Sequence, residues 1–256
     1  MSRVAIVTGA GRGIGKGIAL RLAKDGLDVV VNDINSKNIE QVAKEIESIG
    51  QKTLAIVADV SNKGQVYEMV DQVVKKFGRL DVMVANAGIS FVKPFIEVTV
   101  EEWDRVFNVN SKGVFLCDQA AAKQMIKQKS GKIINCSSIA GVQGTTNLLS
   151  TYSASKFAVR GFSQVLSREL AEYGITVNVY CPGVVGTEMW DLIDEEMGPY
   201  MGLPKGEALK HYSKGIPLGR VETPEDVAGT VSFLASPDSD YMTGQAIVID
   251  GGLVVT

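Results

Sequence analysis

The sequence predicts an α/β fold in which one parallel sheet is doubly wound, with helices on both of its faces. Short apolar, β-branched segments alternate with amphipathic segments of helical period through the first half of the chain. A glycine-rich turn joins the first strand to the first helix, and polar residues follow several later strands. A length of 256 residues is ordinary for one domain of this class. We therefore expect residues 1–256 to form a single domain.

The first strand and helix flank the glycine turn. Val4 to Val7 has the composition of a strand buried on both faces. Ile14, Ile18 and Leu22 recur every four residues, so one apolar stripe of the following helix faces the sheet. Such a turn directs backbone N–H groups and the positive end of the helix at one point, which is a site for a phosphate. The glycine spacing matches neither G-x-G-x-x-G nor the phosphate-binding loop of NTPases.

The later elements continue this alternation. Further strands are predicted at 28–32, 53–58, 80–85 and 132–136. Helices are predicted at 39–49, around 66–77, at 101–127 with an interruption near 108–113, and from 152 onward. Gly50 and Gly78 are placed to end the first two of these helices. The last helix is expected to bury Phe157, Phe162, Val165, Leu166 and Leu170.

Acidic residues at two strand ends indicate a dinucleotide. Asp33 ends the second strand, where a carboxylate accepts hydrogen bonds from ribose hydroxyls; alternatively it caps a turn with Asn32 and Asn35. A carboxylate at this point repels the 2′-phosphate of NADP, so NAD is favoured. Arg12 in the glycine turn argues mildly for NADP, since it could bind a phosphate, but an arginine beside the pyrophosphate is useful with either cofactor. Asp59, after the third strand, either caps the next helix or accepts from the adenine amino group.

These strand ends are expected to converge. The fourth strand runs into Asn86-Ala87-Gly88, where a glycine lets the backbone approach a flat ligand. In a parallel sheet, ligands bind beyond the carboxyl ends of the strands. The glycine turn at 9–15, Asp33, Asp59 and residues 86–88 all fall at such ends. The sequence therefore predicts one ligand site at this edge.

Composition excludes several other functions. The net charge of −3, with both signs interspersed, provides no basic surface for nucleic acid or a membrane, so a small-molecule partner is expected. No apolar run approaches the ~20 residues of a membrane span, and the first strand begins too early for a signal peptide, so we expect a cytoplasmic protein. Cys117, Cys136 and Cys181 are expected to be buried thiols. His211 is the only histidine, which argues against a Ser-His-Asp triad and a metal site.

Tyr152 and Lys156 are candidates for an acid/base pair. Residues four apart on a helix share a face, so the ammonium can lie beside the phenol. A free phenol has a pKa of about 10, and lowering it by ~3 units requires about 4 kcal/mol of preferential stabilisation of the phenolate. Lys156 can supply part of this stabilisation, and a cationic nicotinamide ring can supply more of it. The alternative is a solvated helix start. Two further sets of residues are candidates for a functional role: Asn110, in mid-helix, and Ser137-Ser138, after a strand.

Several motifs occur together along the chain. They are T-G-A-G-R-G-I-G at 8–15, A-D-V at 58–60, N-A-G at 86–88, Asn110, Ser138, Y-S-A-S-K at 152–156 and P-G at 182–183. Over essentially its whole length the chain thereby resembles the short-chain dehydrogenase/reductase family. The resemblance implies a Rossmann-type sheet of about seven strands and an NAD-dependent oxidoreductase. It also implies a homotetramer, built by pairing the helices at 101–127 and 157–173.

The resemblance also implies residue roles. Tyr152 would be the general acid/base, Lys156 would lower its pKa and hold the ribose, and Ser138 would hydrogen-bond the substrate oxygen. Asn110 would support a proton-relay water, and Thr187 would contact the nicotinamide carboxamide. No metal is implied. The cofactor is expected to contact Gly9, Arg12, Gly13, Ile14, Gly15, Asp33, Asp59, Val60, Asn86, Gly88, Tyr152, Lys156, Pro182, Gly183 and Thr187.

The chain departs from the family pattern at two places. The family usually has N-N-A-G, whereas this chain has Ala85 at the first position and so lacks one structural amide. Thirteen residues rather than twelve separate Ser138 from Tyr152, which leaves the lining of the intervening loop open. Ser138 is preferred to Ser137 because the family's serine lies three residues before a glycine, here Gly141.

The C-terminal third has a narrower resemblance, to acetoin (diacetyl) reductases and 2,3-butanediol dehydrogenases. The matching stretches are C-P-G-V-V-G-T-E-M-W at 181–190, L-G-R-V-E-T-P-E-D-V-A at 218–228 and A-S-P-D-S-D-Y-M-T-G-Q at 235–245. This implies interconversion of a small ketone and a secondary alcohol, with diacetyl, acetoin and 2,3-butanediol as first candidates. The alternatives are a polyol dehydrogenase of the sorbitol or xylitol type and a non-catalytic NAD-binding sensor.

Residues 188–216 interrupt the alternation of strands and helices with an apolar segment between glycines and prolines. Such a segment can close over a site as a lid and exclude water; alternatively it covers the sheet edge or an oligomer contact. Met189 and Trp190, with Ile139, are expected to enclose the substrate beside Ser138 and Tyr152. Such a pocket favours a compact, weakly polar carbonyl, because each buried sugar hydroxyl would need a partner.

Overall fold

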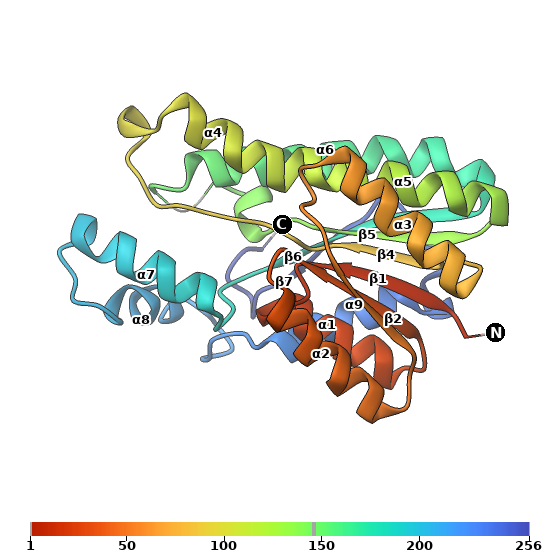
Figure 1. The fold of residues 1–256 in the computed structure, drawn as a ribbon. Coiled ribbons are helices and arrows are strands. Elements are labelled where there is room, and N and C mark those ends of the chain that lie inside the picture. Colours follow the sequence, from red (N-terminus) through yellow and green to blue (C-terminus); the bar gives the residue numbers. More distant parts are fainter. Residues whose placement is uncertain (1, 145–146, 256) are drawn as a thin grey trace.

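One sheet of seven parallel strands forms the centre of the protein, as predicted. The computed structural model describes residues 2–144 and 147–255. The strand order is β3-β2-β1-β4-β5-β6-β7, and the sheet twists through the molecule in Figure 1. The strands are β1 Val4–Thr8, β2 Asp28–Asp33, β3 Thr53–Val57, β4 Val82–Ala85, β5 Gly131–Cys136, β6 Ile175–Pro182 and β7 Ala246–Ile249.

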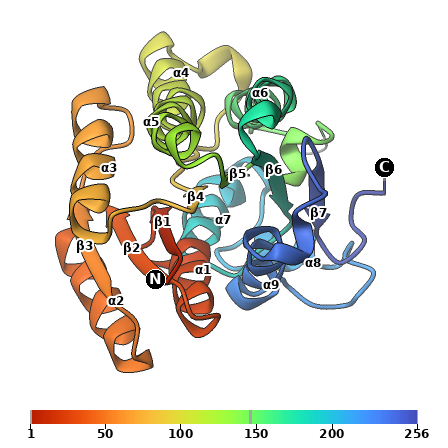
Figure 2. The ribbon, with the colours of Figure 1, turned by 90° about the vertical axis from the view of Figure 1, so that its right-hand side faces the viewer.

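Helices cover both faces of the sheet. They are α1 Gly13–Lys24, α2 Ser36–Ile49, α3 Lys63–Phe77, α4 Val100–Phe107, α5 Gly113–Gln128, α6 Ser150–Leu170, α7 Glu188–Met201, α8 Glu207–Ser213 and α9 Pro224–Ala235. Figure 2 shows α1, α2 and α9 on one face, with α3, α5 and α6 on the other. The predicted doubly wound arrangement is confirmed.

Each face of the sheet has its own apolar core. Ile18 of α1 and Val231 of α9 pack with Val7 in one cluster. Met69 of α3 packs in the other cluster, which contains Ile6. Side chains alternate between the faces of a strand, so neighbouring residues of β1 enter opposite cores. This is why β1 reads as a continuous apolar run.

The prediction for the buried face of α6 is partly wrong. Phe162 and Leu166 are partly buried and Leu170 is buried, but Phe157 and Val165 are exposed. The buried stripe instead contains Ser155, Val159, Ser163 and Ser167. Serine hydroxyls can bond to carbonyls of their own helix, as Ser163 does to Val159 at 2.7 Å, which makes a small polar stripe compatible with burial. A pattern of apolar residues does not reveal such a face.

The predicted interruption of the long helical stretch is confirmed. Between α4 and α5 the chain forms a wider π-helical turn, η2, at Asn108–Lys112. Asn110 lies in this turn and is fully buried. Its side chain accepts from the N–H of Ile89 and donates to the carbonyl of Ile89, both at 2.9 Å, and it donates to Ser155 Oγ at 3.1 Å. Asn110 thus fastens the loop after β4 to α6.

Helix α3 is capped by a different residue from the one proposed. The side chain of Asn62 accepts from the N–H of Gln65 at the start of α3. Asp59 instead accepts from the backbone N–H and the hydroxyl of Ser61, at 2.8 and 2.7 Å. The capping interpretation of Asp59 is therefore wrong, because the helix starts at Lys63, too late for Asp59 to reach its first turn. The predicted ends of α2 and α3 at left-handed Gly50 and Gly78 are confirmed.

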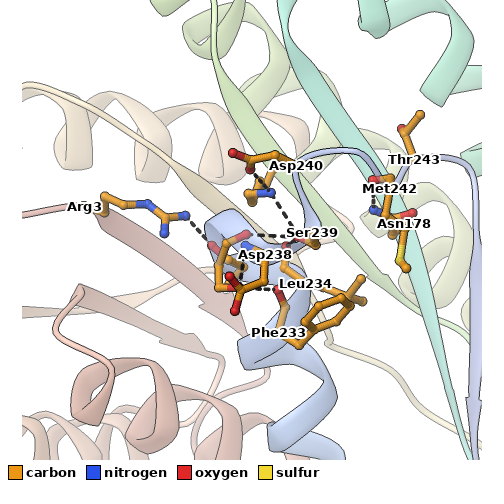
Figure 3. Close-up of polar contacts among 12 residues, drawn as sticks. Arg3, Asn178, Phe233, Leu234, Asp238, Ser239, Asp240, Met242 and Thr243 are labelled. Atoms are coloured by element: carbon orange, nitrogen blue, oxygen red, sulfur yellow. Dashed lines mark hydrogen bonds and ion pairs between the residues drawn. The ribbon is translucent and has the colours of Figure 1, made fainter.

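Hydrogen bonds fasten the C-terminal segment to the sheet. Asn178 of β6 donates to the carbonyl of Met242 at 2.8 Å, and Ser239 donates to the carbonyl of Leu234 at 2.8 Å, as Figure 3 shows. The buried Lys132, at the start of β5, donates to Ser239 Oγ at 3.0 Å. The segment between α9 and β7 is thereby held beside β5 and β6.

Cys117, Cys136 and Cys181 are buried free thiols, as predicted. Within the described parts of the chain, no helix combines the length and the apolar composition needed to cross a membrane.

Asp118 is a buried carboxyl between α5 and β5. It is 1% exposed, and its Oδ2 accepts from Asn135 Nδ2 at 2.7 Å. Burial raises the pKa of Asp118 to about 8, against the smaller lowering by the Asn135 hydrogen bond. The carboxyl is therefore mostly protonated at neutral pH in the folded chain.

This carboxyl predicts a pH-dependent stability. The unfolded chain ionises Asp118 near its ordinary pKa of about 4, whereas the folded chain keeps the proton up to about pH 8. The folded state then binds more protons, so the free energy of unfolding falls as pH rises between these values. Asp118→Asn should reduce this fall by about 2 to 4 kcal/mol, measured by urea unfolding at about pH 5 and pH 8. An equal fall in both proteins would contradict the assignment.

Candidate active site

The carboxyl edge of the sheet contains a switch point between β1 and β4. From β1 the chain proceeds outward to β2 and β3, and then it crosses to β4 and continues in the opposite direction. The loops after β1 and β4 consequently diverge, which leaves a crevice where ligands bind in doubly wound sheets. The predicted residues after β1, β2, β4, β5 and β6 all belong to this edge.

The glycine turn after β1 fits a phosphate. Gly9 and Gly13 have φ values of +62° and +51°, a region that favours glycine. A Cβ on Gly15 would lie 2.1 Å from the carbonyl oxygen of Gly9, so only glycine is accommodated there. Helix α1 starts at Gly13 without a cap from any described side chain, which leaves its first N–H groups available to an anion. Arg12 is exposed beside the turn and Ile14 is half-buried.

Asp33 lies against this turn. Its Oδ2 accepts from the N–H of Gly11 at 3.2 Å, and its Oδ1 accepts from the N–H of Asn35 at 3.1 Å. The turn-capping alternative is therefore realised in the structure. The carboxylate also borders the glycine turn, so a contact with the ribose of a bound dinucleotide stays a prediction.

Asn86 joins the glycine turn to the turn after β4. Its Nδ2 donates to the carbonyls of Thr8 and Gly9, at 2.9 and 3.3 Å. The Thr8 hydroxyl accepts from the N–H groups of Asn86 and Ala87, at 3.0 and 3.1 Å. Side-chain hydrogen bonds therefore join the two turns that flank the switch point.

Two predicted catalytic residues, Lys156 and Asn110, meet at Gly88, and a third, Tyr152, lies beside Lys156. The Lys156 ammonium lies 5.6 Å from the centroid of the Tyr152 ring and donates to the carbonyl of Cys136 at 2.8 Å. A Cβ on Gly88 would lie 3.5 Å from Lys156 Nζ and 3.4 Å from Asn110 Oδ1. Helix α6, the π-helical turn and the loop after β4 thus bring residues from distant parts of the sequence to one point.

Ser138 completes this group. It is 8% exposed, and its Oγ accepts from the N–H of Ala140 in the short 3₁₀ helix η3, Ile139–Gly141, which follows β5. Burial raises the pKa of Tyr152, and the Ser138 hydroxyl is one of the groups that lower it. The hydroxyl of Ser137 instead donates to the carbonyl of Lys156 at 2.9 Å. This arrangement favours Ser138 over Ser137 as the residue that faces the phenol.

The Tyr152 phenol is protonated at neutral pH in this structure. Burial raises its pKa, and the Lys156 ammonium and the Ser138 hydroxyl lower it by less. Lys156 therefore provides part of the stabilisation that a phenolate needs, and burial outweighs it. A protonated phenol is suited to donate a proton to a substrate oxygen.

The end of β6 leads to the apolar segment at 188–216. After Pro182, the N–H of Gly183 donates to Glu222 Oε2 at 2.9 Å, and burial raises the pKa of Glu222 to about 7. Thr187 precedes α7, and a Cβ on Gly13 would lie 3.2 Å from Thr187 Cγ2. A cavity of about 430 Å³ adjoins this contact, lined by residues of α1, α7, α8 and the start of α9. Gly13 of the glycine turn lines this cavity, whereas Tyr152 is not among its lining residues.

The apolar segment consists of two helices, α7 and α8, which project beyond the sheet (Figure 1). Their residues Ile193, Met197 and Ala208 form a small core with Val92 and Leu149. The partly buried residues packed against this core are Leu148, Tyr152, Met189, Trp190, Met201 and Tyr212. The predicted substrate residues Met189 and Trp190 therefore share a cluster with Tyr152. Ile139 is buried beside Ser138 but is not a member of this cluster.

Sequence reasoning missed several residues of the site. Leu149 comes from the loop at 139–151, whose lining the sequence left open and whose residues 145–146 lie outside the described residues. Val92 comes from the loop after β4, for which the sequence predicted no substrate contact. The adjacent Leu148 and Leu149, an apolar pair in a polar loop, were an available signal. The hydrogen bonds that join Thr8 and Tyr180 to Asn86 have no signal in the neighbouring sequence.

Known proteins resemble the chain closely. The model of the short chain dehydrogenases matches residues 3–198. A diacetyl reductase, (S)-acetoin forming, from Staphylococcus epidermidis is 53% identical over 256 residues, which is 99% of each protein. L-2,3-butanediol dehydrogenase from Corynebacterium glutamicum is 48% identical and covers 99% of each protein.

Solved structures agree with this assignment. A variant of actinorhodin polyketide ketoreductase, solved with NADPH, has a TM-score of 0.94 and 36% identity, covering 98% of this chain and 97% of its own. Levodione reductase has a TM-score of 0.91 and 32% identity, covering 98% and 96%. With its glycine turn, its parallel sheet and its grouped serine, tyrosine and lysine, the chain belongs to the short-chain dehydrogenase/reductase family of oxidoreductases.

Proposed function

We propose that the protein is an NAD(H)-dependent reductase of small ketones that interconverts diacetyl, acetoin and 2,3-butanediol. The observation that carries this proposal is the grouping of Tyr152 with Lys156 and Ser138, while Tyr152 also packs in the apolar cluster of α7 and α8, here called the lid cluster, with Met189 and Trp190. The full-length similarity to a diacetyl reductase and a butanediol dehydrogenase supports the choice of substrate.

Each catalytic side chain has a proposed task. A bound nicotinamide ring supplies or accepts the hydride. Ser138 donates a hydrogen bond that polarises the substrate carbonyl, and Tyr152 transfers the proton to the same oxygen. Lys156, held by the carbonyl of Cys136, favours the phenolate that remains and holds the ribose. Asn110 holds the loop after β4 and supports a proton-relay water.

NAD is the proposed cofactor because of Asp33. Its carboxylate borders the glycine turn through Gly11, and a 2′-phosphate placed there would meet a like charge. Arg12 is exposed next to the same turn and weakens this preference without cancelling it.

Asp33→Ser should relax the cofactor preference. We expect the ratio of the dissociation constants for NADPH and NADH to fall about tenfold, because a repulsion worth roughly 1.4 kcal/mol is removed. Titration of both reduced cofactors, followed by their fluorescence, measures the ratio. Tighter binding of NADPH than NADH by the unmutated protein would refute the argument from Asp33.

Helices α7 and α8 are the proposed lid, within residues 188–216. Asp194 of α7 accepts from the N–H groups of Leu209, at 2.8 Å, and of Gly206, so α7 caps the start of α8 and the two helices are joined. Glu196 Oε2 accepts from the N–H of Val92 at 2.8 Å, which fastens α7 to the loop after β4.

Glu196→Ala should raise KM for the ketone more than it lowers kcat. Glu195→Ala, an exposed neighbour on α7, is the matched control and should change neither.

The lid cluster favours a compact substrate. Its members are mainly aliphatic and aromatic side chains, so a sugar alcohol would bury hydroxyls without partners, each costing about 1 to 3 kcal/mol. A four-carbon ketone places only one or two oxygens there, and Ser138 and Tyr152 can bond to one of them.

A comparison of substrates tests the proposed function. We expect kcat/KM with NAD(H) to be highest for diacetyl, acetoin or one stereoisomer of 2,3-butanediol. Sorbitol and xylitol should be slower by at least about a hundredfold, since two unpaired hydroxyls cost about 3 kcal/mol. A tenfold preference for either polyol would overturn the substrate assignment but not the family. Failure of every carbonyl to oxidise NADH would favour a non-catalytic sensor.

The protein is proposed to be a cytoplasmic homotetramer. Phe115 on α5 and Phe157 and Val165 on α6 are exposed, which is unusual for apolar side chains on neighbouring helices of a monomer. Pairing of α4–α5 and α6 between copies would cover them. Sedimentation of a monomer at micromolar concentration would contradict this proposal. The buried free thiols are consistent with a reducing compartment.

A further inference from the structure

Tyr180 is a buried phenol beneath the cofactor edge of the sheet. It lies in β6, has no exposed surface, and is among the largest fully buried side chains. A buried hydroxyl is costly unless it has a hydrogen-bond partner. The Tyr180 hydroxyl lies 2.9 Å from Oδ1 of Asn86, which follows β4.

The direction of this hydrogen bond is determined by the other partners of Asn86. The amide nitrogen faces the carbonyls of Thr8 and Gly9, at 2.9 and 3.3 Å, and carbonyls only accept. Oδ1 must therefore face Tyr180, and the phenol must donate. Burial raises the pKa of Tyr180 well above its ordinary value, so this donor keeps its proton.

Asn86 is packed directly against the glycine turn. A Cβ on Gly15 would lie 2.6 Å from Asn86 Nδ2, and a Cβ on Gly9 would lie 3.1 Å from it. There is consequently little room for Asn86 to rotate without moving the turn. The amide that Tyr180 orients is the same amide that sets the separation between the turns after β1 and β4.

We propose that Tyr180 is a positioning residue for the dinucleotide, acting through Asn86 on the spacing between the glycine turn and the turn after β4. The proposal rests on the proposed binding of a nicotinamide dinucleotide between these turns. Tyr180 has no exposed surface with which to contact a cofactor or a substrate directly. Among the described residues, its hydroxyl is the donor to Asn86 Oδ1, and it thereby completes the hydrogen bonds of this amide.

Tyr180→Phe tests this role with a matched control. The variant keeps the ring and leaves Asn86 Oδ1 buried without its donor. Tyr67→Phe removes a comparable bond, from a phenol to Gln119 Oε1 at 2.5 Å, between α3 and α5. Both variants should lower the thermal midpoint by a few degrees. Only Tyr180→Phe should weaken NADH binding, by about tenfold, with kcat at saturating NADH within about threefold of the parent.

A double-mutant cycle separates positioning from general loosening. In an Asn86→Ala background, Tyr180→Phe should change the dissociation constant of NADH by less than about twofold, because the residue through which it acts is absent. The cycle depends on a folded Asn86→Ala protein. The comparison of Tyr180→Phe with Tyr67→Phe does not need the Asn86→Ala protein. It therefore decides the question if Asn86→Ala does not fold.

Two results would overturn the proposal. One is an unchanged NADH dissociation constant in Tyr180→Phe, which would make the phenol a purely structural residue. The other is an equal loss of affinity in Tyr67→Phe. Measuring NADH and NADPH in parallel distinguishes these failures from a wrong cofactor assignment. That error would appear as tighter NADPH binding by the unmutated protein, and the effect of Tyr180→Phe would then be measured with NADPH.

Discussion

Tyr152→Phe is expected to lower kcat by about a thousandfold while NADH binds within about threefold of the parent. Proton transfer by a positioned side chain contributes about 10² to 10⁴ in rate, and this variant removes the only hydroxyl of the residue. The ring that packs against the lid cluster remains, and so does Lys156 with its bond to the carbonyl of Cys136. The loss should therefore fall on turnover and leave binding largely intact.

The control for this experiment is Tyr241→Phe, because Tyr241 is fully exposed and far along the chain from the site. It should be indistinguishable from the parent in kcat and in NADH affinity. Turnover by Tyr152→Phe within tenfold of the parent would exclude Tyr152 as the proton donor. Loss of the parent's activity on treatment with a chelator would point to a metal-dependent reaction instead.

Gly15→Ala is expected to weaken NADH binding by at least about a hundredfold. The added Cβ would lie 2.1 Å from the carbonyl oxygen of Gly9 and 2.6 Å from Asn86 Nδ2. Backbone atoms cannot yield as a flexible side chain can, so the turn must open. The N–H groups at the start of α1 would then no longer converge on one phosphate. A hundredfold change corresponds to about 2.7 kcal/mol, a moderate cost for displacing a packed turn.

Gly64→Ala is the matched control for this substitution. Gly64 is exposed in the first turn of α3, and its nearest neighbour, Asn62 Oδ1, would lie at an ordinary 3.4 Å from an added Cβ. This variant should bind NADH like the parent and be equally or slightly more stable, because alanine favours a helix. Isothermal calorimetry and thermal melts measure both effects. Parent-like NADH affinity in Gly15→Ala would show that the turn does not hold the cofactor.

The sequence was sufficient to predict the architecture. Strands buried on both faces, such as β1 and β2, require continuous β-branched runs, and helices packed on a sheet require apolar residues at helical spacing. Glycines that end helices in the left-handed conformation, such as Gly50 and Gly78, could also be recognised. All of these signals are local, because each depends on residues within about one or two turns of one another.

The candidate site was predictable where its chemistry is local. Tyr152 and Lys156 are one helical turn apart, and the glycine turn is a contiguous segment. Parallel topology implies that strand ends share an edge, so the sequence alone assigns Asp33, Asn86 and Ser138 to the same edge of the sheet. The sequence could not settle Asp59, since capping depends on where α3 begins, and that start is at Lys63.

The remaining features were decided by tertiary structure alone. The buried face of α6 contains small serines, whose burial depends on how closely the helix approaches the sheet and not on their own hydrophobicity. Tyr180 meets Asn86 across 94 positions of the chain, and Glu196 meets Val92 across 104. A tyrosine in a strand or a glutamate on a helix looks the same in sequence whether it is solvated or paired. Only the packing that buries a polar group and excludes water from it determines its hydrogen-bond partner.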